Sequence, residues 1–300
     1  MTAVRHRPSP LRWWLTRLVI AVAIGLVFAV VADYARGGIT AIWLRYVGAA
    51  AYDARGERIE IASGHSLYLD CRGSGSPTLI LEAGMGADSA TWSPVLDQLA
   101  GITRTCAYDR TGRGRSDGGS ANDLVGMSAE LSALLEAADE PGPYVVVGHS
   151  LGTVIGRVHA SLAPDVVGLV LVDGFDPDIF DDRIVPLLGP IRDQYTGHTA
   201  GLWSVIGDVE KIDVERSRSQ LAASDVEGLL VEVLLAPRVD SRLDAATLRQ
   251  VDAAWRDAYE DLSPGRVTLT FAEGAGHMVQ FDRPDLVVEA VRRLVASVRG

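Results

Sequence analysis

Short, mostly apolar runs alternate with longer segments of helical periodicity along most of the chain. The apolar runs predict buried strands at residues 78–82, 103–108, 144–147, 167–172 and 267–272. Helices are predicted between and after them, at residues 93–99, 127–138, 151–163, 243–262 and 284–298. Strands that alternate with helices at this spacing favour an α/β fold, with a mostly parallel, doubly wound sheet covered by helices on both faces.

Three segments depart from this alternation. Residues 57–71 alternate in polarity around Ser63-Gly64-His65, which predicts a β-hairpin. Residues 228–236 are mostly apolar and fit either a strand or the end of a helix. Between about residues 175 and 225 the pattern loosens, with proline, glycine, tryptophan and acidic residues intermixed. We expect a helical insertion there that covers the functional site.

The N-terminal segment differs in kind from the rest of the chain. Four arginines precede the first acidic residue, Asp33, and residues 18–32 form an uninterrupted apolar run. A basic start followed by such a run is typical of a signal peptide or a signal anchor. With Trp13 and Trp14 ahead of it, the run reaches the ~20 residues that a bilayer requires, which favours an uncleaved transmembrane anchor. The alternative is cleavage after residues 30–32 and secretion.

These features divide the chain into a membrane segment with its linker, residues 1–53, and a globular domain, residues 54–300. The positive-inside tendency leaves the N-terminus in the cytoplasm and the domain outside it, on a single-pass protein of the cell membrane. Residues 39–52 are predicted to form a second, interfacial helix. The membrane is therefore an expected partner through the N-terminal segment.

Composition narrows the functional classes. A chain of 300 residues with 48% hydrophobic residues can bury a full core. The net charge of −11 disfavours nucleic-acid binding, since no basic patch stands out beyond the N-terminus. Cys71 and Cys106 fall in strands expected to be neighbours, so either a cross-strand disulfide or two buried thiols fits. No cysteine or histidine spacing indicates a metal site, and no cofactor is implied.

The strongest chemical signal is Gly148-His149-Ser150-Leu151-Gly152, between the predicted strand 144–147 and the predicted helix 151–163. A serine between glycines at a strand-to-helix turn is the setting of a nucleophile elbow. The backbone at such a serine is strained, and a side chain at Gly148 or Gly152 would collide with the neighbouring strand and helix. The alternative is a glycine-rich turn whose serine caps the helix.

A serine hydroxyl needs a base, and the base needs a third group to hold it in the right tautomer. Among the six histidines, His277 alone follows a late strand in a glycine-bracketed loop, which can carry it over the sheet to Ser150. Two aspartates compete for the acid. Asp173 ends the predicted strand 167–172, and Asp240 follows the segment 228–236. We favour Asp173 because the strand before it is the clearer one, and Asp240 stays the alternative.

An oxyanion hole needs two backbone N–H groups aimed at the developing negative charge. Leu151, directly after Ser150, is expected to supply one, and Met85, in the turn Gly84-Met85-Gly86 after an earlier strand, the other. The turn that begins at Asp109 and Arg110 is interpreted as a salt-bridged support of the site, not a participant in its chemistry.

Taken together, these segments resemble the α/β-hydrolase superfamily over roughly residues 57–300. The motifs that carry the resemblance, in the order and spacing of that superfamily, are LEAGMGADSATW, CAYDRTGRGRSD, PYVVVGHSLG, VVGLVLVDG and EGAGHMVQFDRPDLV. The chain looks like the subgroup of membrane-anchored bacterial hydrolases. The resemblance implies the α/β-hydrolase fold, with Ser150 as nucleophile, His277 as base, and Met85 and Leu151 as oxyanion donors.

The expected activity is that of a carboxylesterase- or lipase-like serine hydrolase acting on a small-molecule ester or related acyl substrate. Serine at the nucleophile position disfavours the superfamily's dehalogenase and epoxide-hydrolase chemistries, which proceed through an aspartyl ester. One alternative is an acyltransferase, in which an alcohol replaces water. The other is a non-catalytic binding protein on the same fold, against which the intact Ser150 and His277 weigh.

Overall fold

The computed structural model describes residues 52–300 except 62–63, 120, 175–178, 196 and 238–241. The chain divides into two compact units, Met1–Gly48 and Ala49–Gly300, and the described residues all belong to the second. The predicted anchor at residues 18–32 and nearly all of the predicted interfacial helix lie outside the described residues. Within the part of the chain that is described, no helix is long and apolar enough to cross a membrane.

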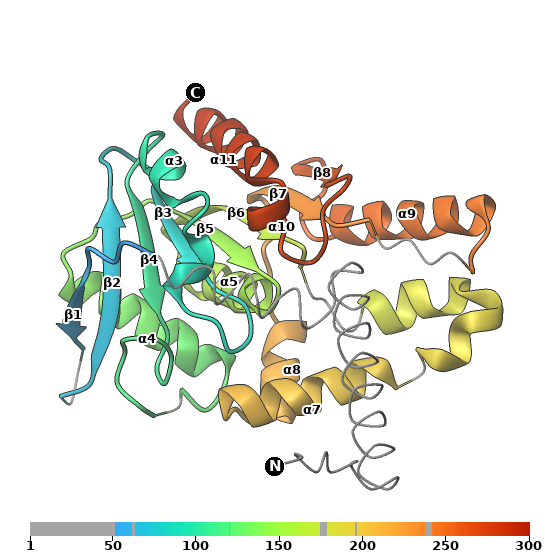
Figure 1. Ribbon diagram of the computed structural model, residues 1–300, viewed down its shortest axis with the longest axis horizontal. Coiled ribbons are helices and arrows are strands. Elements are labelled where there is room, and N and C mark those ends of the chain that lie inside the picture. Colours follow the sequence, from blue (N-terminus) through green and yellow to red (C-terminus); the bar gives the residue numbers. More distant parts are fainter. Residues whose placement is uncertain (1–51, 62–63, 120, 175–178, 196, 238–241) are drawn as a thin grey trace, which may run out of the picture. The chain divides into compact units, whose positions relative to one another are not determined.

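An eight-stranded sheet forms the centre of the second unit, in the order β1-β2-β4-β3-β5-β6-β7-β8 (Figure 1). The strands are β1 (Glu57–Glu60), β2 (Ser66–Arg72), β3 (Thr78–Glu82), β4 (Thr105–Asp109), β5 (Tyr144–His149), β6 (Val166–Val172), β7 (Leu230–Leu235) and β8 (Val267–Phe271). Strands β3 to β8 run parallel, and β1 and β2 form the predicted antiparallel hairpin at one edge. The mostly parallel sheet is confirmed, and the ambiguous segment 228–236 is a strand.

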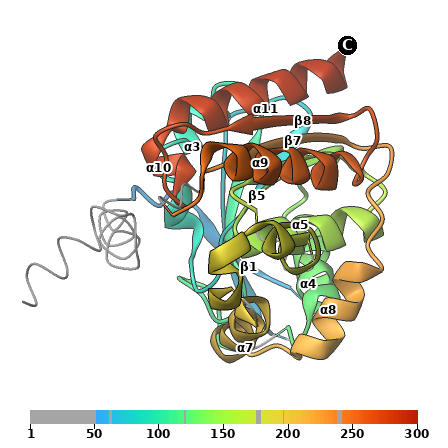
Figure 2. The same ribbon diagram turned by 90° about the vertical axis from the view of Figure 1, so that its right-hand side faces the viewer.

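Alternate residues of the central strands enter two separate cores, because successive side chains of a strand point to opposite faces of the sheet. On β5, Tyr144 and Val146 belong to one core and Val145 and Val147 to the other. Helices α4 (Leu124–Ala137), α5 (Leu151–Leu162) and α9 (Ala245–Glu260) lie on the first face, and α3 (Leu96–Ala100) and α11 (Pro284–Arg299) on the second (Figure 2). The double layer of helices explains why these strands read as continuous apolar runs.

Aspartates define where three of the helices begin. The side chains of Asp123, Asp213 and Asp244 accept hydrogen bonds from backbone N–H groups in the first turns of α4, α8 (Val214–Ala222) and α9. Such caps satisfy donors that have no partner within the helix. The predicted helix at residues 93–99 is confirmed as α3, which begins at Leu96, and a 3₁₀ turn, η2 (Ser89–Trp92), precedes it.

The chain between β6 and β7, which we call the insertion, is largely helical, as expected. It contains a π-helical turn η3 (Phe180–Ile184), two 3₁₀ segments η4 (Val185–Leu187) and η5 (Gly189–Gln194), and the helices α7 (His198–Glu210) and α8. Trp203 and Ile206 of α7 pack with Leu151 and Val154 of α5 in a third apolar cluster. The insertion is thereby anchored on the helix that follows Ser150.

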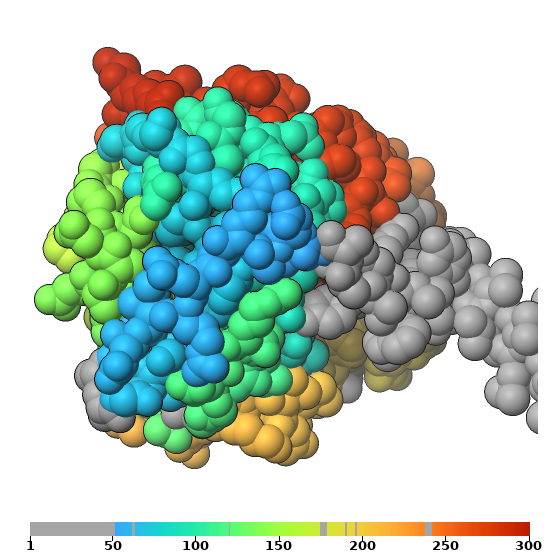
Figure 3. All heavy atoms as spheres, turned by 60° about the vertical axis from the view of Figure 1, so that its left-hand side comes forward, coloured from blue at the N-terminus to red at the C-terminus, as the bar shows by residue number. Residues whose placement is uncertain are grey.

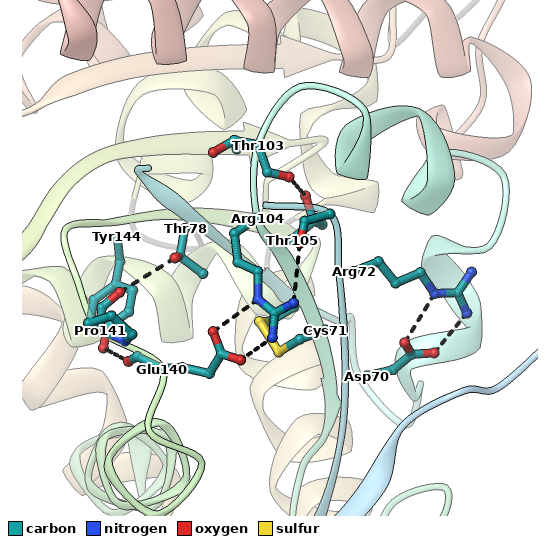
Figure 4. The surroundings of a disulfide bond; sticks show 12 residues. Asp70, Cys71, Arg72, Thr78, Thr103, Arg104, Thr105, Glu140, Pro141 and Tyr144 are labelled. Atoms are coloured by element: carbon teal, nitrogen blue, oxygen red, sulfur yellow. Dashed lines mark hydrogen bonds and ion pairs between the residues drawn. A yellow bond between two sulfur atoms is a disulfide. The ribbon is translucent and has the colours of Figure 1, made fainter. Parts of the chain in front are cut away.

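Cys71 and Cys106 form a disulfide between β2 and β4, where they are register partners. Of the two alternatives open from the sequence, the cross-strand bridge is the one the structure contains. The ion pair of Arg104 with Glu140 lies next to it (Figure 4). The bridge ties the antiparallel edge of the sheet, seen in blue at the surface in Figure 3, to its parallel centre.

We expect loss of this disulfide to lower the free energy of unfolding by about 2–4 kcal/mol, because the bridge closes a loop across a sequence separation of 35 residues. The measurement is chemical denaturation of Cys71→Ala/Cys106→Ala beside the oxidised and the reduced wild-type protein. The reduced wild-type protein and the double variant should unfold at the same denaturant concentration, which should be lower than that for the oxidised protein. Unchanged unfolding midpoints in both would contradict a stabilising role for the bridge.

Candidate active site

Ser150 occupies the turn between β5 and α5, in a backbone conformation that few L-residues adopt, with φ 54° and ψ −120°. Its N–H donates to Val172 O at 3.1 Å, and its carbonyl accepts from Thr153 N at 3.0 Å and Thr153 Oγ1 at 2.7 Å. These bonds hold the strained turn from both sides. The side chain of Ser150 makes no capping hydrogen bond to α5, so the helix-cap alternative does not apply. The elbow interpretation matches the geometry.

The glycines on either side of Ser150 allow this turn to pack. A Cβ on Gly148 would lie 2.4 Å from Gly152 O, and one on Gly152 would lie 2.2 Å from Glu82 O at the end of β3. Both distances are far inside van der Waals contact with rigid backbone. As the sequence predicts, only glycine lets strand, turn and helix approach so closely.

The turn Gly84-Met85-Gly86 lies directly beside the elbow. A Cβ on Gly84 would be 3.4 Å from Ser150 Cβ, and Met85 packs against the apolar cluster that contains Leu151. Gly86 has a φ of +68°, which favours glycine. The two predicted oxyanion residues thus come from segments that meet at Ser150.

His277 follows β8 and meets the end of β6. Its Nδ1 lies 2.6 Å from Asp173 Oδ2, and its side chain is 35% exposed while that of Asp173 is 4% exposed. The second carboxylate oxygen of Asp173 accepts from Ala236 N at 2.9 Å, and Asp173 N donates to Leu234 O at 2.7 Å. The carboxylate of Asp173 is therefore fixed to the end of β7 by one oxygen while the other contacts His277. Asp240, the alternative acid, lies outside the described residues.

His149 connects the His277 loop to the elbow, a role that the sequence did not suggest. Its Nε2 lies 2.8 Å from His277 O, and the two imidazole rings are 4.8 Å apart. Because a carbonyl only accepts, Nε2 must carry the proton. Burial is the main cause that lowers the pKa of His149 to about 3, so the ring stays neutral. Only its place beside Ser150 marks it in the sequence.

A buried ion-pair network is hydrogen-bonded to the backbone of the Met85 turn. Arg110 Nη1 lies 2.6 Å from Glu82 Oε1, and Arg110 Nη2 lies 3.1 Å from Oε1 of Glu210 in the insertion. Tyr108 donates a hydrogen bond to Glu82. Although burial disfavours the charged carboxylate, Arg110 and the N–H of Gly86 outweigh it and lower the pKa of Glu210.

The contacts of Asp109 and Arg110 match their interpretation as a supporting turn. Asp109 accepts from the backbone N–H groups of Ser89 and Arg115, whereas Arg110 pairs with Glu82 and Glu210. Glu82 could have been noticed in the sequence, because it is a carboxylate at the end of a buried apolar strand. That strand, β3, pairs with β4, which Arg110 follows directly. Glu210 could not have been singled out, because the insertion contains several acidic residues.

Among the described residues, one group has spacing suited to a metal ion, formed by Cys71, Cys106 and Glu140. Its sulfur atoms are joined in the disulfide and cannot act as thiolate ligands.

A sequence model of the alpha/beta hydrolase family matches residues 79–290, more than half of the chain. The chain belongs to the alpha/beta hydrolase family. The match takes in Ser150, His277 and Asp173, together with the Met85 turn and the insertion.

The chain also matches curated proteins over part of its length. It shares 35% identity over 112 residues with RutD of Azorhizobium caulinodans, a putative carbamate hydrolase, in a match covering 36% of this chain and 41% of that protein. The chain spans less than half the length of the curated relatives that it matches first.

Two solved structures show the same fold. An esterase from Thermogutta terrifontis superposes with a TM-score of 0.54 at 20% identity, covering 82% of this chain and 100% of that one. A putative acyltransferase from Salmonella enterica superposes with a TM-score of 0.55 at 17% identity, covering 81% and 95%. At such identities the likeness concerns the fold alone.

We expect Gly148→Ala to destabilise the protein by about 3 kcal/mol or more, since the new Cβ would overlap the backbone of α5. Gly201→Ala is the matched control, because nothing lies within 4 Å of a Cβ at that position of α7. The control should leave stability unchanged or raise it by up to about 1 kcal/mol. Urea denaturation measures both, and equal stability of the two variants would contradict the close packing at the elbow.

Acid should destabilise the protein in part through His149. Its pKa is about 3 in the folded protein against an ordinary value of 6.5, so the unfolded chain binds one more proton between these values. The stabilisation is complete above pH 6.5 and is lost as the pH falls, by about 2 kcal/mol between pH 7 and pH 5. His149→Gln, which removes the titrating group, should show a correspondingly weaker pH dependence in urea denaturation. The same dependence in both proteins would contradict the neutral, buried His149.

Proposed function

We propose that this protein is a serine hydrolase that cleaves an ester or related acyl substrate through an acyl-enzyme on Ser150. The observation that carries the proposal is the 2.6 Å contact of His277 Nδ1 with the buried Asp173, in a loop whose His277 carbonyl is bonded by His149, the residue before a serine held at positive φ. Acyl transfer to serine requires a hydroxyl, an imidazole that acts as its base and a carboxylate that orients the imidazole.

The protonation states follow from the contacts. The carboxylate of Asp173 accepts from Nδ1–H of His277, which leaves Nε2 as the basic nitrogen. In the proposed reaction Ser150 Oγ attacks the substrate carbonyl and Nε2 takes its proton. The N–H groups of Met85 and Leu151 stabilise the oxyanion of the tetrahedral intermediate.

The intermediate collapses when the C–O bond to the leaving group breaks and His277 returns the proton to the departing alcohol. Water then attacks the acyl-enzyme with His277 again acting as the base, and the carboxylic acid leaves as Ser150 regains its proton. No oxidant or reductant is needed. In an acyltransferase, an alcohol would replace water in the second half of this sequence.

The membrane-anchored location also stays a proposal. The arginine-led apolar run at residues 18–32 supports an anchor with the domain outside the cytoplasm, or a cleaved signal peptide. The disulfide between Cys71 and Cys106 supports either version, since such bonds persist in oxidising compartments.

The proposal predicts that a fluorophosphonate probe labels the full-length protein in detergent, and that Ser150→Ala abolishes both labelling and hydrolysis of short p-nitrophenyl esters. Ser132→Ala, an exposed serine on α4, is the matched control and should be labelled like wild type. Asp173→Asn should lower kcat on the order of 10⁴-fold, because the wrong tautomer of His277 is then favoured. Asp240→Asn should leave kcat within about twofold, as expected of a residue outside the triad.

Two results would overturn this assignment. Folded wild-type protein without labelling or turnover, or undiminished labelling of Ser150→Ala, would remove Ser150 from the chemistry. A loss of activity in Asp240→Asn that Asp173→Asn does not show would replace the acid. Addition of methanol separates the two acyl acceptors, since a transferase forms the methyl ester in preference to the free acid.

A further inference from the structure

The peptide between Gly84 and Met85 contains both a carbonyl held by Arg110 and the proposed oxyanion donor. Arg110 Nη2 donates to Gly84 O at 2.8 Å, and Arg110 Nη1 donates to Ala83 O at 2.7 Å. A trans peptide is planar, with its C=O and N–H pointing in opposite directions. By holding Gly84 O, the guanidinium therefore sets the direction of the Met85 N–H.

The next peptide is held by Glu210. Its Oε1 accepts from Gly86 N at 2.6 Å and from Arg110 Nη2 at 3.1 Å. The two peptide planes that meet at the Met85 Cα are thus both held from outside the turn. One carboxylate oxygen links the second plane to the guanidinium that holds the first.

Glu210 is not a local residue of this turn. It lies in the last turn of α7, in the insertion, and its side chain is only 1% exposed. Arg113 lies 3.3 Å from its second oxygen and also donates to Val209 O. A Cβ on Gly86 would be 3.4 Å from Val209 Cγ1, so this end of α7 packs directly on the turn.

The charges of the network do not by themselves require this arrangement. Glu82 already neutralises Arg110, with 2.6 Å between the charged atoms and both side chains at most 4% exposed. A second carboxylate from the insertion adds the bond to Gly86 N–H, which an ion pair serving stability alone would not need. Arg113 balances its charge, so two arginines face two glutamates.

We propose that Glu210 is a positioning residue for the oxyanion hole, and that the Met85 N–H is correctly aimed only while the end of α7 is seated on the turn. This inference rests on the proposed function of Ser150 and Met85. It assigns to the insertion a role in positioning the oxyanion donor, in addition to the cover of the site that the sequence predicts. Any movement of the end of α7 away from the turn would remove a support of the oxyanion donor.

The test compares Glu210→Ala and Glu210→Gln with Asp208→Ala, a carboxylate on the same helix that is exposed. Each full-length variant is assayed for kcat and KM with p-nitrophenyl butyrate, for the Ki of phenylboronic acid and for thermal unfolding. The tetrahedral adduct of the boronic acid with serine places an oxygen where the oxyanion forms, so its affinity reports the hole without turnover.

For Glu210→Ala we expect kcat to fall roughly tenfold to 100-fold with KM nearly unchanged, and the Ki to rise in parallel. Glu210→Gln should lose less, because its amide oxygen still accepts from Gly86 N–H. Asp208→Ala should match wild type. If Glu210→Ala does not fold, Glu210→Gln alone tests the inference. We then expect its kcat to fall and its Ki to rise, each by a few-fold.

An unchanged kcat and Ki in a folded Glu210 variant would overturn the inference, as would a loss confined to KM or to thermal stability. Failure of the proposed function is recognised separately. In that case the wild-type protein is not labelled by the fluorophosphonate probe, or the label survives Ser150→Ala. Labelling that depends on Ser150 together with indifferent Glu210 variants would reject only the role of Glu210.

Discussion

The close approach of three backbone segments at Ser150 is the constraint on which the rest of the site depends. Strand β5 must turn into α5 at a residue with positive φ, while Gly152 presses against the end of β3. A conformation of this kind costs on the order of 1–3 kcal/mol and persists only where the surroundings over-determine it. Here the surroundings are the parallel sheet itself, whose strands end together at this edge.

Buried polar groups around the elbow divide into a neutral side and a charged side. On one side His149 holds the loop of His277 as an uncharged donor, since burial lowers its pKa to about 3. On the other side Arg110 holds the Met85 turn as a charged donor, with Glu82 and Glu210 as its partners. A neutral imidazole can be buried alone with one hydrogen bond, whereas a buried guanidinium needs carboxylates to offset its desolvation. This difference explains why Arg110 is buried together with Glu82, while Glu210 of the insertion adds the bond to the Gly86 N–H.

Most of the secondary structure could be predicted because the apolar periodicity is strong in the core. The ambiguous segment 228–236 forms a strand, because it pairs with β6 on one side and with β8 on the other. The choice of Asp173 over Asp240 rested on the clarity of the preceding strand, and the structure brings Asp173 to His277. The predicted helix at residues 93–99 is present but begins at Leu96, after a separate 3₁₀ turn at Ser89–Trp92 that is begun by the side chain of Asp88.

The sequence by itself determined the local elements, the glycine requirement at residues 148 and 152, and the nature of the candidate nucleophile and base. These follow from side-chain periodicity and from backbone chemistry within a few residues. Only the tertiary structure decided the disulfide, the partner of His277 Nδ1, and the joint hold of Arg110 and Glu210 on the Met85 turn. Those contacts join residues up to 124 positions apart, and their existence depends on distances that no local pattern encodes.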